Sequence, residues 1–297
     1  MLSIRKLLTI SILGFSILLG TSAVAGMQSP DSIFDHADSL FTQRGNNRPK
    51  IAEARAAYLA LVTDDMPIEN RVYAVQQVGW LAHYEGTYLI PSNRKKEIAA
   101  VFNECYELAS TIGESLEYKT MNVFWALSCR SLWMQVATLS QQLAALKSMK
   151  HELGLIIDDD LEVHTHLNVD TRYMGGGVSR VLSGIFRTDQ ASMIRNTLPN
   201  KPFSLEMVAR ALSARPYPGT NMWGIEFYKN YTYKATSLIS LGEDESAEEL
   251  LEDIIEEVEE RIEDEDLPES LEPETLGELE KMRDLLFQLK MKSIKNF

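Results

Sequence analysis

The sequence predicts an all-α protein, built as an array of TPR-like helical hairpins in either a solenoid or a compact bundle. Apolar residues recur at the three- and four-residue spacing of an amphipathic helix along most of the 297-residue chain. Strand-like alternation is scarce, and short polar or proline-containing segments separate one periodic stretch from the next. A succession of helix, short loop and helix is typical of helical bundles and solenoids.

The first 25 residues have the pattern of a secretory signal peptide. A positively charged start precedes an apolar run at residues 7–19, and small residues end in Ala-Val-Ala at residues 23–25. Because the apolar run is shorter than the roughly 20 residues that span a bilayer, we expect cleavage after Ala25. The expected location is therefore the periplasm, or the medium if the protein is secreted, with residues 26–297 forming one helical domain.

The charge of the chain argues against two classes of partner. Its formal net charge is −14 at pH 7, and 45% of its residues are apolar. Acidic proteins repel nucleic acid and anionic lipid surfaces, so we expect neither as a partner. No segment of the mature chain is apolar enough to insert into a membrane, whereas the apolar content suffices for a substantial core.

Helix-breaking and helix-capping residues define the expected helix boundaries in the first half of the chain. One apolar face at about residues 51–61 ends before Pro67, and a second helix is expected at about 68–84. Ser92 or Asn93 can cap the helix that follows. Three further helices are predicted at about residues 94–112, 118–138 and 140–157.

Glycines and prolines divide the second half. A glycine-containing helix at about 169–186 and a short one at about 204–213 precede a firm break at 216–219. An aromatic-rich helix is expected at about 221–241, where four residues repeat at intervals of four: Trp223, Phe227, Tyr231 and Ala235. Two amphipathic stripes, at about 250–262 and 276–289, predict the last two helices. The acidic C-terminal part, residues 243–297, is therefore expected to be helical.

A degenerate tetratricopeptide (TPR) pattern is visible in places. Such a unit has a small residue where its two helices cross, a large residue one turn later, and a helix breaker at the end. Ala54, Tyr58 and Pro67 fit the second helix of a unit. The clearest full unit runs from Tyr228 to Val258, although the spacing between units is irregular.

Residues 173–186 read Tyr-Met-Gly-Gly-Gly-Val-Ser-Arg-Val-Leu-Ser-Gly-Ile-Phe. This segment resembles the Gly-Gly-Pro-x-Arg-x-Leu-Gly segment of the TPR-like T-component proteins associated with TRAP transporters, often called TatT. Val178 stands where that family usually has Pro, and Ser183 where it has Gly. The resemblance implies a helical TPR-like scaffold and a role in delivering solutes to a transporter. It implies no reaction.

Candidate ligand-binding residues lie in this motif and among the aromatics. Gly176 and Gly177 could present backbone N–H groups to an anion that Arg180 would pair with, such as a carboxylate. Alternatively, the glycines allow close helix packing and Arg180 bonds to neighbouring carbonyls or acids. Trp223 and Tyr231 belong to a larger aromatic set that lines either a ligand groove or the core: Trp80, Tyr84, Trp125, Trp133, Trp223, Phe227 and Tyr231.

The two cysteines, Cys105 and Cys129, fall on consecutive predicted helices and lie symmetrically about Glu117. In an antiparallel hairpin they would reach a similar height, which allows a disulfide between the helices. Two buried thiols are the alternative. The spacing of His164 and His166 matches no metal motif, so we expect neither a metal nor a cofactor.

The sequence shows no nucleophile, base or metal-ligand constellation, so we expect no enzyme. The first hypothesis is an exported TPR-like scaffold that binds a protein partner or transporter subunit in the cell envelope. The alternative is a solute-handling component, similar to the T-component proteins, that binds a small organic acid near Arg180. A weaker alternative is a hydrolase of envelope polymers. An open groove would favour the scaffold, and an enclosed pocket would favour solute binding.

Overall fold

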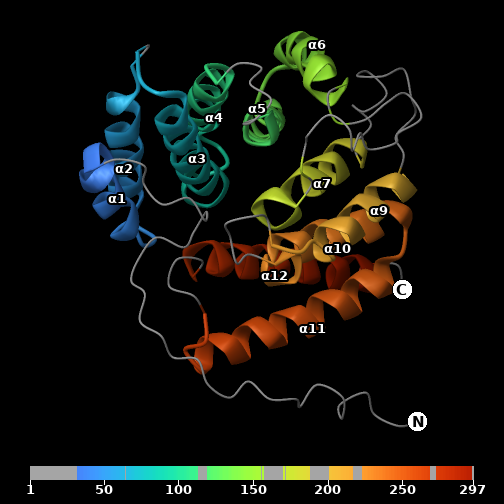
Figure 1. The fold of residues 1–297 in the computed structure, drawn as a ribbon. Coiled ribbons are helices and arrows are strands. Elements are labelled where there is room, and N and C mark those ends of the chain that lie inside the picture. The colour runs from blue at the N-terminus through green and yellow to red at the C-terminus, as the bar shows by residue number, and fades with distance from the viewer. Residues whose placement is uncertain are drawn as a thin grey trace.

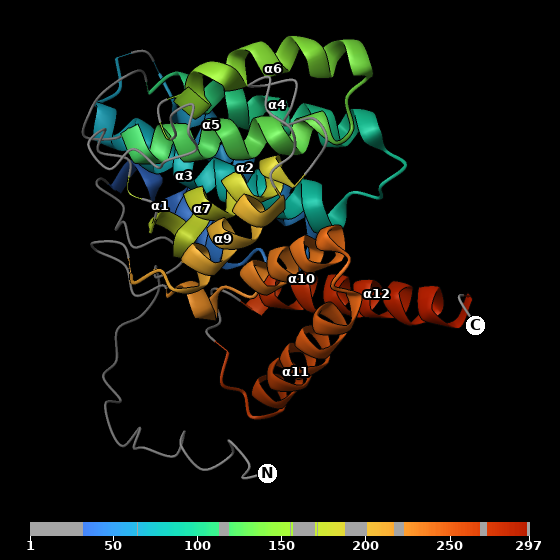
Figure 2. The same ribbon diagram turned by 90° about the vertical axis from the view of Figure 1, so that its right-hand side faces the viewer.

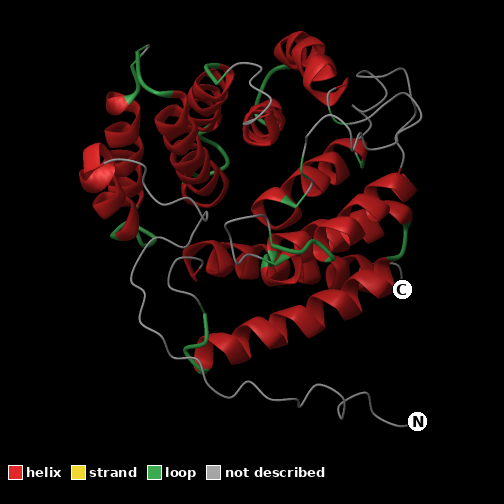
Figure 3. Ribbon diagram, viewed as in Figure 1, coloured by secondary structure: helices red, strands yellow, loops and turns green. Residues whose placement is uncertain are grey.

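The computed structural model describes residues 32–63, 65–112, 119–154, 156, 170, 172–187, 201–216, 223–267 and 272–295. Helices account for 82% of these residues, and none of them lies in a strand (Figure 3). The all-α prediction is therefore confirmed for this part of the chain. The predicted signal peptide and the segment with His164 and His166 lie outside the described residues.

Helices succeed one another along the described residues. The first half contains η2 (Ser32–Phe34), α1 (Asp35–Thr42), α2 (Arg48–Leu61), α3 (Ile68–Tyr84), η3 (Glu85–Leu89), α4 (Lys95–Ser110), α5 (Lys119–Met134) and α6 (Leu139–Gly154). The second half contains α7 (Tyr173–Phe186), α9 (Lys201–Leu212), η4 (Gly224–Glu226), α10 (Lys229–Leu241), α11 (Asp244–Glu263) and α12 (Glu272–Lys295). Across the part of the chain that is described, no helix has the length and apolar character needed to cross a bilayer.

Local chemistry explains where several helices begin and end. The side chain of Asn47 caps α2 by accepting a hydrogen bond from the backbone N–H of Lys50 at 3.2 Å. Gly242 ends α10 with a left-handed backbone, φ +84°, which a residue without a Cβ adopts readily. In α11 the buried residues recur at helical spacing while acidic side chains cover the outer face, so the acidic segment is helical as predicted.

Within α1–α6 and within α7–α12, helices that are neighbours in the sequence are also neighbours in space. Contacts join α1 to α2, α2 to α3, α3 to α4, α4 to α5 and α5 to α6, and then α7, α9, α10, α11 and α12 in succession. In Figures 1 and 2, α4–α6 lie in the upper part of the molecule and α10–α12 in the lower part, with α7 and α9 between them. A large hydrophobic cluster runs from η2 through α9, and a second one unites α10, α11 and α12.

The first turn of α7 differs from the continuous helix predicted at 169–186. Met174, Gly175 and Gly176 have left-handed backbones, with φ of 54°, 58° and 80°. A Cβ on Gly176 would lie 2.5 Å from the Cα of Ala211 in α9. The glycines therefore let the chain turn sharply and let α7 approach α9 more closely than any larger residue would allow.

The prediction of a single helix at 221–241 was also wrong. Trp223 is extended, η4 occupies the next three residues, and α10 begins only at Lys229. The backbone N–H of Gly224 donates to the carbonyl of Ala214 at 2.9 Å, and a Cβ on Gly224 would overlap the carbonyl of Ala211. This close approach to α9 breaks the helix, so the four-residue spacing of the aromatics here does not describe one face.

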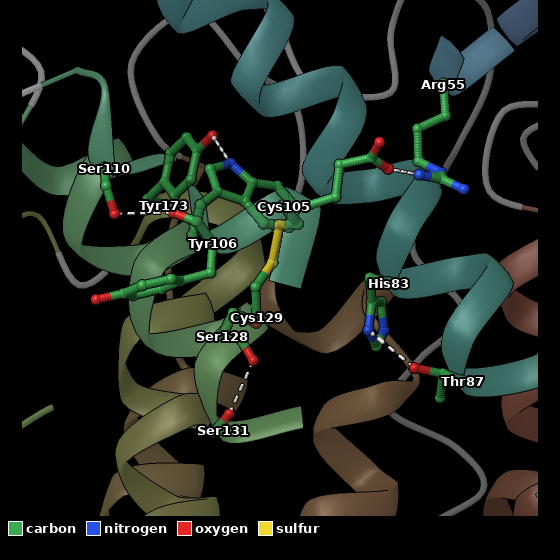
Figure 4. The surroundings of a disulfide bond; sticks show 12 residues. Arg55, His83, Thr87, Cys105, Tyr106, Ser110, Ser128, Cys129, Ser131 and Tyr173 are labelled. Atoms are coloured by element: carbon green, nitrogen blue, oxygen red, sulfur yellow. Dashed lines mark hydrogen bonds and ion pairs between the residues drawn. A yellow bond between two sulfur atoms is a disulfide. The ribbon is translucent and has the colours of Figure 1, made fainter. Parts of the chain in front are cut away.

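Cys105 and Cys129 form a disulfide that joins α4 to α5, with their Cα atoms 6.0 Å apart (Figure 4). Both residues are buried in the large cluster. The hairpin that places them at a similar height is the one that the sequence predicts, and of the two alternatives the structure contains the bonded pair.

Candidate functional site

Three adjacent cavities lie between the upper helices and α10–α12. The large cavity has a volume of about 340 Å³, whereas the central cavity and the α12 cavity measure about 30 and 20 Å³. The large and central cavities share wall residues Ser131, Val181 and Tyr233. The central and α12 cavities share Trp80, His83, Phe227 and Lys229.

The large cavity is formed by α5, α6, α7 and α10. Its walls combine apolar and polar side chains: Ser131, Met134, Gln135, Gln142, Met149, Val181, Gly184, Ile185, Arg187 and Tyr233. Pockets for small molecules usually have volumes of roughly 300–1,000 Å³, and they combine apolar walls with a few polar groups. The large cavity meets both criteria, whereas the other two admit only about one or two water-sized groups.

Arg187 follows the last residue of α7 and provides the positive charge of the large cavity. Its Nη1 donates to the Oγ1 of Thr236, and its guanidinium lies 5.3 Å from the ring centre of Tyr233. Burial lowers the pKa of Arg187 from its ordinary value. No carboxylate of the described residues forms an ion pair with it. A partly buried cation whose described partners are all neutral can still form a charge-assisted hydrogen bond with an anion.

Arg180 is 4% exposed and lines the central cavity. Its Nη1 donates to Asn230 Oδ1 at 2.6 Å and to the carbonyl of Gly175 at 3.3 Å, and its Nη2 donates to the carbonyl of Met174 at 3.2 Å. The guanidinium also lies 4.3 Å from the ring centre of Phe227. Burial lowers the pKa of Arg180 to about 10, so the side chain remains charged at pH 7.

The glycine motif supports Arg180 structurally instead of forming an open anion cradle. The left-handed turn directs the Met174 and Gly175 carbonyls toward the guanidinium, and Asn230 Nδ2 donates to Gly175 at 2.9 Å. Gly176 is packed on α9, and a Cβ on Gly177 would lie 2.6 Å from the ring of Phe124. Both glycines are buried. The geometry therefore favours the close-packing interpretation of Gly176 and Gly177.

Lys229 and His83 form a buried pair where the central and α12 cavities meet. Lys229 Nζ contacts His83 Nε2, and His83 Nδ1 lies 3.1 Å from Thr87 Oγ1 (Figure 4). Burial, reinforced by Lys229, Lys281 and Arg180, places the pKa of His83 well below its ordinary value. The ring is therefore neutral at pH 7. The tautomer that fits its two partners carries its proton on Nδ1, which donates to Thr87, while Nε2 accepts from Lys229.

Two glutamates of α12 face the α12 cavity. Glu274 accepts from Arg44 at 3.2 Å and from Trp80 Nε1, and burial raises its pKa. Glu278 accepts from Tyr88 and, at 2.6 Å, from Thr232. Burial raises the pKa of Glu278, but Lys281, Lys229 and these hydrogen bonds outweigh it, so the net shift is downward. A cavity of about 20 Å³ between the two carboxylates has no room for a polymer.

The aromatic candidates separate into two groups. Trp80, Trp125 and Phe227 belong to the wall of the central cavity. Trp223, just before η4, is 45% exposed, and Tyr231 packs against the second hydrophobic cluster beside Tyr228. The structure therefore does not bring Trp223 and Tyr231 to the cavities that Arg180 and Arg187 line. The break at Gly224 separates Trp223 from α10, and Tyr231 lies in α10 but packs on the other hydrophobic cluster.

Sequence reasoning found Arg180 but missed Arg187, Lys229 and His83. Arg187 lies seven residues after Arg180, two turns along the same apolar helix, and this spacing is a signal that could have found it. Lys229 stands among aromatic residues at 223–233, where a buried lysine is unexpected. Nothing near His83 in the sequence marks it, because its partner is 146 residues away.

Comparisons with protein-family models, with curated proteins and with solved structures found no match to this chain. Among the described residues, no group of three or more His, Cys, Asp or Glu side chains could hold a metal ion.

Proposed function

We propose that this protein binds a small organic anion in the large cavity, with Arg187 as the residue that recognises the acidic group. The observation that carries the proposal is the position of Arg187. Its partly buried guanidinium lines a cavity of about 340 Å³ and has only a hydroxyl and an aromatic ring as described partners. Among the described residues, an anion is the partner that this cation lacks.

The shape of the site favours solute handling over a protein scaffold. A scaffold should present an open groove, whereas the large cavity is only partly open, with walls from α5, α6, α7 and α10. The alternative function raised from the sequence, the binding of a small organic acid, is therefore the one we put forward. The acid-recognising arginine becomes Arg187, because Arg180 is already occupied by Asn230 and two carbonyls.

The walls indicate the rest of the ligand. Met134, Met149, Val181 and Ile185 offer apolar surface, and methionine adapts to ligands of different shape. Ser131, Gln135 and Gln142 offer hydrogen-bonding groups along the same walls. These features fit a monocarboxylate with a short aliphatic or aromatic body.

The architecture and location complete the proposal. We infer that the consecutive helices are degenerate TPR-like hairpins, supported by the pairing of consecutive helices within α1–α6 and within α7–α12 and by Ala247 and Leu251, which are buried between α10 and α11. Export to the cell envelope rests on the N-terminal pattern, and a connection to a transporter rests on the resemblance at residues 173–186. N-terminal sequencing of the protein from its native host tests the predicted cleavage after Ala25.

The binding experiment uses benzoate as an anionic probe and benzyl alcohol as its neutral analogue. We expect calorimetry to show benzoate binding at least about tenfold more tightly, because only benzoate can pair with Arg187. Arg187→Gln should remove this preference. Arg210→Gln, which changes an exposed arginine paired with Glu206 on α9, is the matched control and should keep it. Equal affinity of the two probes for the wild type would contradict the proposal.

A protein-binding scaffold remains the second candidate because of one surface feature. Ile225 on η4 and Trp223, the residue just before η4, are 56% and 45% exposed. If this turn docks a partner, the double variant Trp223→Ser, Ile225→Ser should lose a co-purifying protein while it still binds benzoate. Retention of every co-purifying protein by the variant would remove the support that η4 gives to this candidate.

A further inference from the structure

We propose that Lys229 is a reactive amine that forms an imine with an oxo acid, a ligand that carries both an aldehyde or ketone and a carboxylate. The proposal deepens the proposed function and rests on it for the route of entry through the large cavity. The reactive position is the wall that Lys229 shares between the central and α12 cavities.

The surroundings of Lys229 are those of a functional amine and not of a surface charge. The residue is 8% exposed, and its Nζ contacts His83 Nε2 and lies 6.0 Å from the ring centres of Tyr88 and Tyr233. No carboxylate of the described residues forms an ion pair with it. A lysine without such a partner is seldom buried.

The burial of Lys229 favours the free amine, which is the form that attacks a carbonyl. Burial disfavours the ammonium most, and Lys281 and Arg180 add to this, although Glu278 opposes it, and the pKa of Lys229 is well below its ordinary value. Lys229 is also the first residue of α10, where the positive end of the helix dipole disfavours a cation.

His83 is placed to move the proton in this reaction. The Lys229 nitrogen attacks the carbonyl carbon, and the carbonyl electron pair moves to the oxygen. His83 Nε2 takes a proton from the nitrogen and passes it to that oxygen, which gives a carbinolamine. The carbon–oxygen bond then breaks, the hydroxyl leaves with a second proton from the nitrogen as water, and a carbon–nitrogen double bond remains. The step needs no oxidant or reductant.

Tyr233 links the imine position to the acid-binding position. Its ring lines both the large and the central cavity, and its centre lies 5.3 Å from the guanidinium carbon of Arg187 and 6.0 Å from Lys229 Nζ. A ligand whose carboxylate pairs with Arg187 can therefore extend past this ring toward Lys229. The central cavity, about 30 Å³, accepts only a small unbranched end, which favours an aldehyde or methyl ketone a few bonds from the acid.

The test traps the imine on the intact protein. Succinic semialdehyde supplies the aldehyde and the carboxylate, and butanal is the matched probe without the acid. Each is incubated with the wild type and cyanoborohydride, and the modified lysines are located by peptide mass spectrometry. We expect succinic semialdehyde to label Lys229 about tenfold faster than the exposed Lys96, and His83→Gln to slow labelling at Lys229 while Lys96 is unaffected.

The outcomes separate this proposal from the proposed function. Labelling of Lys96 but not of Lys229 by both probes would overturn the reactive amine, whatever benzoate does. Labelling of Lys229 by both probes alike, unchanged in Arg187→Gln, would support the reactive amine and contradict the role of Arg187. A preference for succinic semialdehyde at Lys229 that Arg187→Gln abolishes would support both.

Discussion

Gly176 and Gly242 have nearly the same backbone conformation in very different surroundings. Their φ angles are 80° and 84°, a region that a residue with a Cβ enters only at a cost. A Cβ on Gly176 would press on the backbone of Ala211, whereas one on Gly242 would meet nothing within 4 Å. Alanine substitutions at these two glycines therefore separate the cost of backbone strain from the cost of steric overlap with α9.

Gly176→Ala should destabilise the protein by about 3 kcal/mol or more, since strain and overlap with α9 add. Gly242→Ala should cost about 1 kcal/mol, because only the left-handed backbone is penalised. Urea denaturation followed by circular dichroism measures both. Equal losses would mean that α7 and α9 are not held together as closely as the structure shows.

The buried His83 makes stability depend on pH. Its pKa is lowered in the folded protein, so the unfolded chain takes up a proton near the ordinary value of 6.5 that the folded protein does not. This contribution favours folding above about pH 6.5 and is lost as the pH falls, by about 1 kcal/mol per pH unit below pH 6. Denaturation at pH 7, 6 and 5 should show a shallower decline in His83→Gln than in the wild type. Parallel curves would contradict a neutral buried ring.

At the residue scale, the sequence identifies a candidate functional side chain only where a local motif surrounds it. Arg180 stands out beside three glycines, and its buried contacts with carbonyls are one of the two alternatives considered. Arg187 shares its helix face but has no motif around it. The pairing of Lys229 with His83 depends on how α10 packs against α3, which local sequence does not encode.

At the scale of elements, the disulfide ties α4 to α5 in the upper part of the molecule. Cys105 and Cys129 are 24 residues apart, so the bond closes a loop in the unfolded chain. Replacing both with serine should lower the free energy of unfolding by about 3 kcal/mol, because the unfolded chain gains entropy. Reductant should have a similar effect on the wild type and none on the double variant. A variant as stable as the wild type would show that the bond contributes nothing.

A local breaker predicted a helix end correctly at Gly242, whose left-handed backbone ends α10. The cap predicted at Ser92 or Asn93 was wrong, because Arg94 is the residue that precedes α4 and no side chain caps that end of the helix. In contrast, the break before α10 arises because Gly224 donates to Ala214 and packs against Ala211. A four-residue aromatic repeat cannot reveal a neighbour that lies on another helix.

At the scale of the whole molecule, apolar periodicity was sufficient to predict the all-α class, since no described residue lies in a strand. The cavities were beyond prediction because their walls come from distant segments. Ser131, Gln142, Arg187 and Tyr233 belong to or follow α5, α6, α7 and α10, and they meet only through packing. The chemistry of the site thus depends on helix arrangement more than on any one motif.

Native mass spectrometry of the protein purified gently from its own host tests the central claim, the binding of a small organic anion at Arg187, most directly. We predict that the wild type and Arg210→Gln retain a small organic acid that Arg187→Gln loses, while all three show the same charge-state distribution of a folded protein. A ligand-free wild type, or a small acid retained equally by Arg187→Gln, would contradict the assignment of the large cavity.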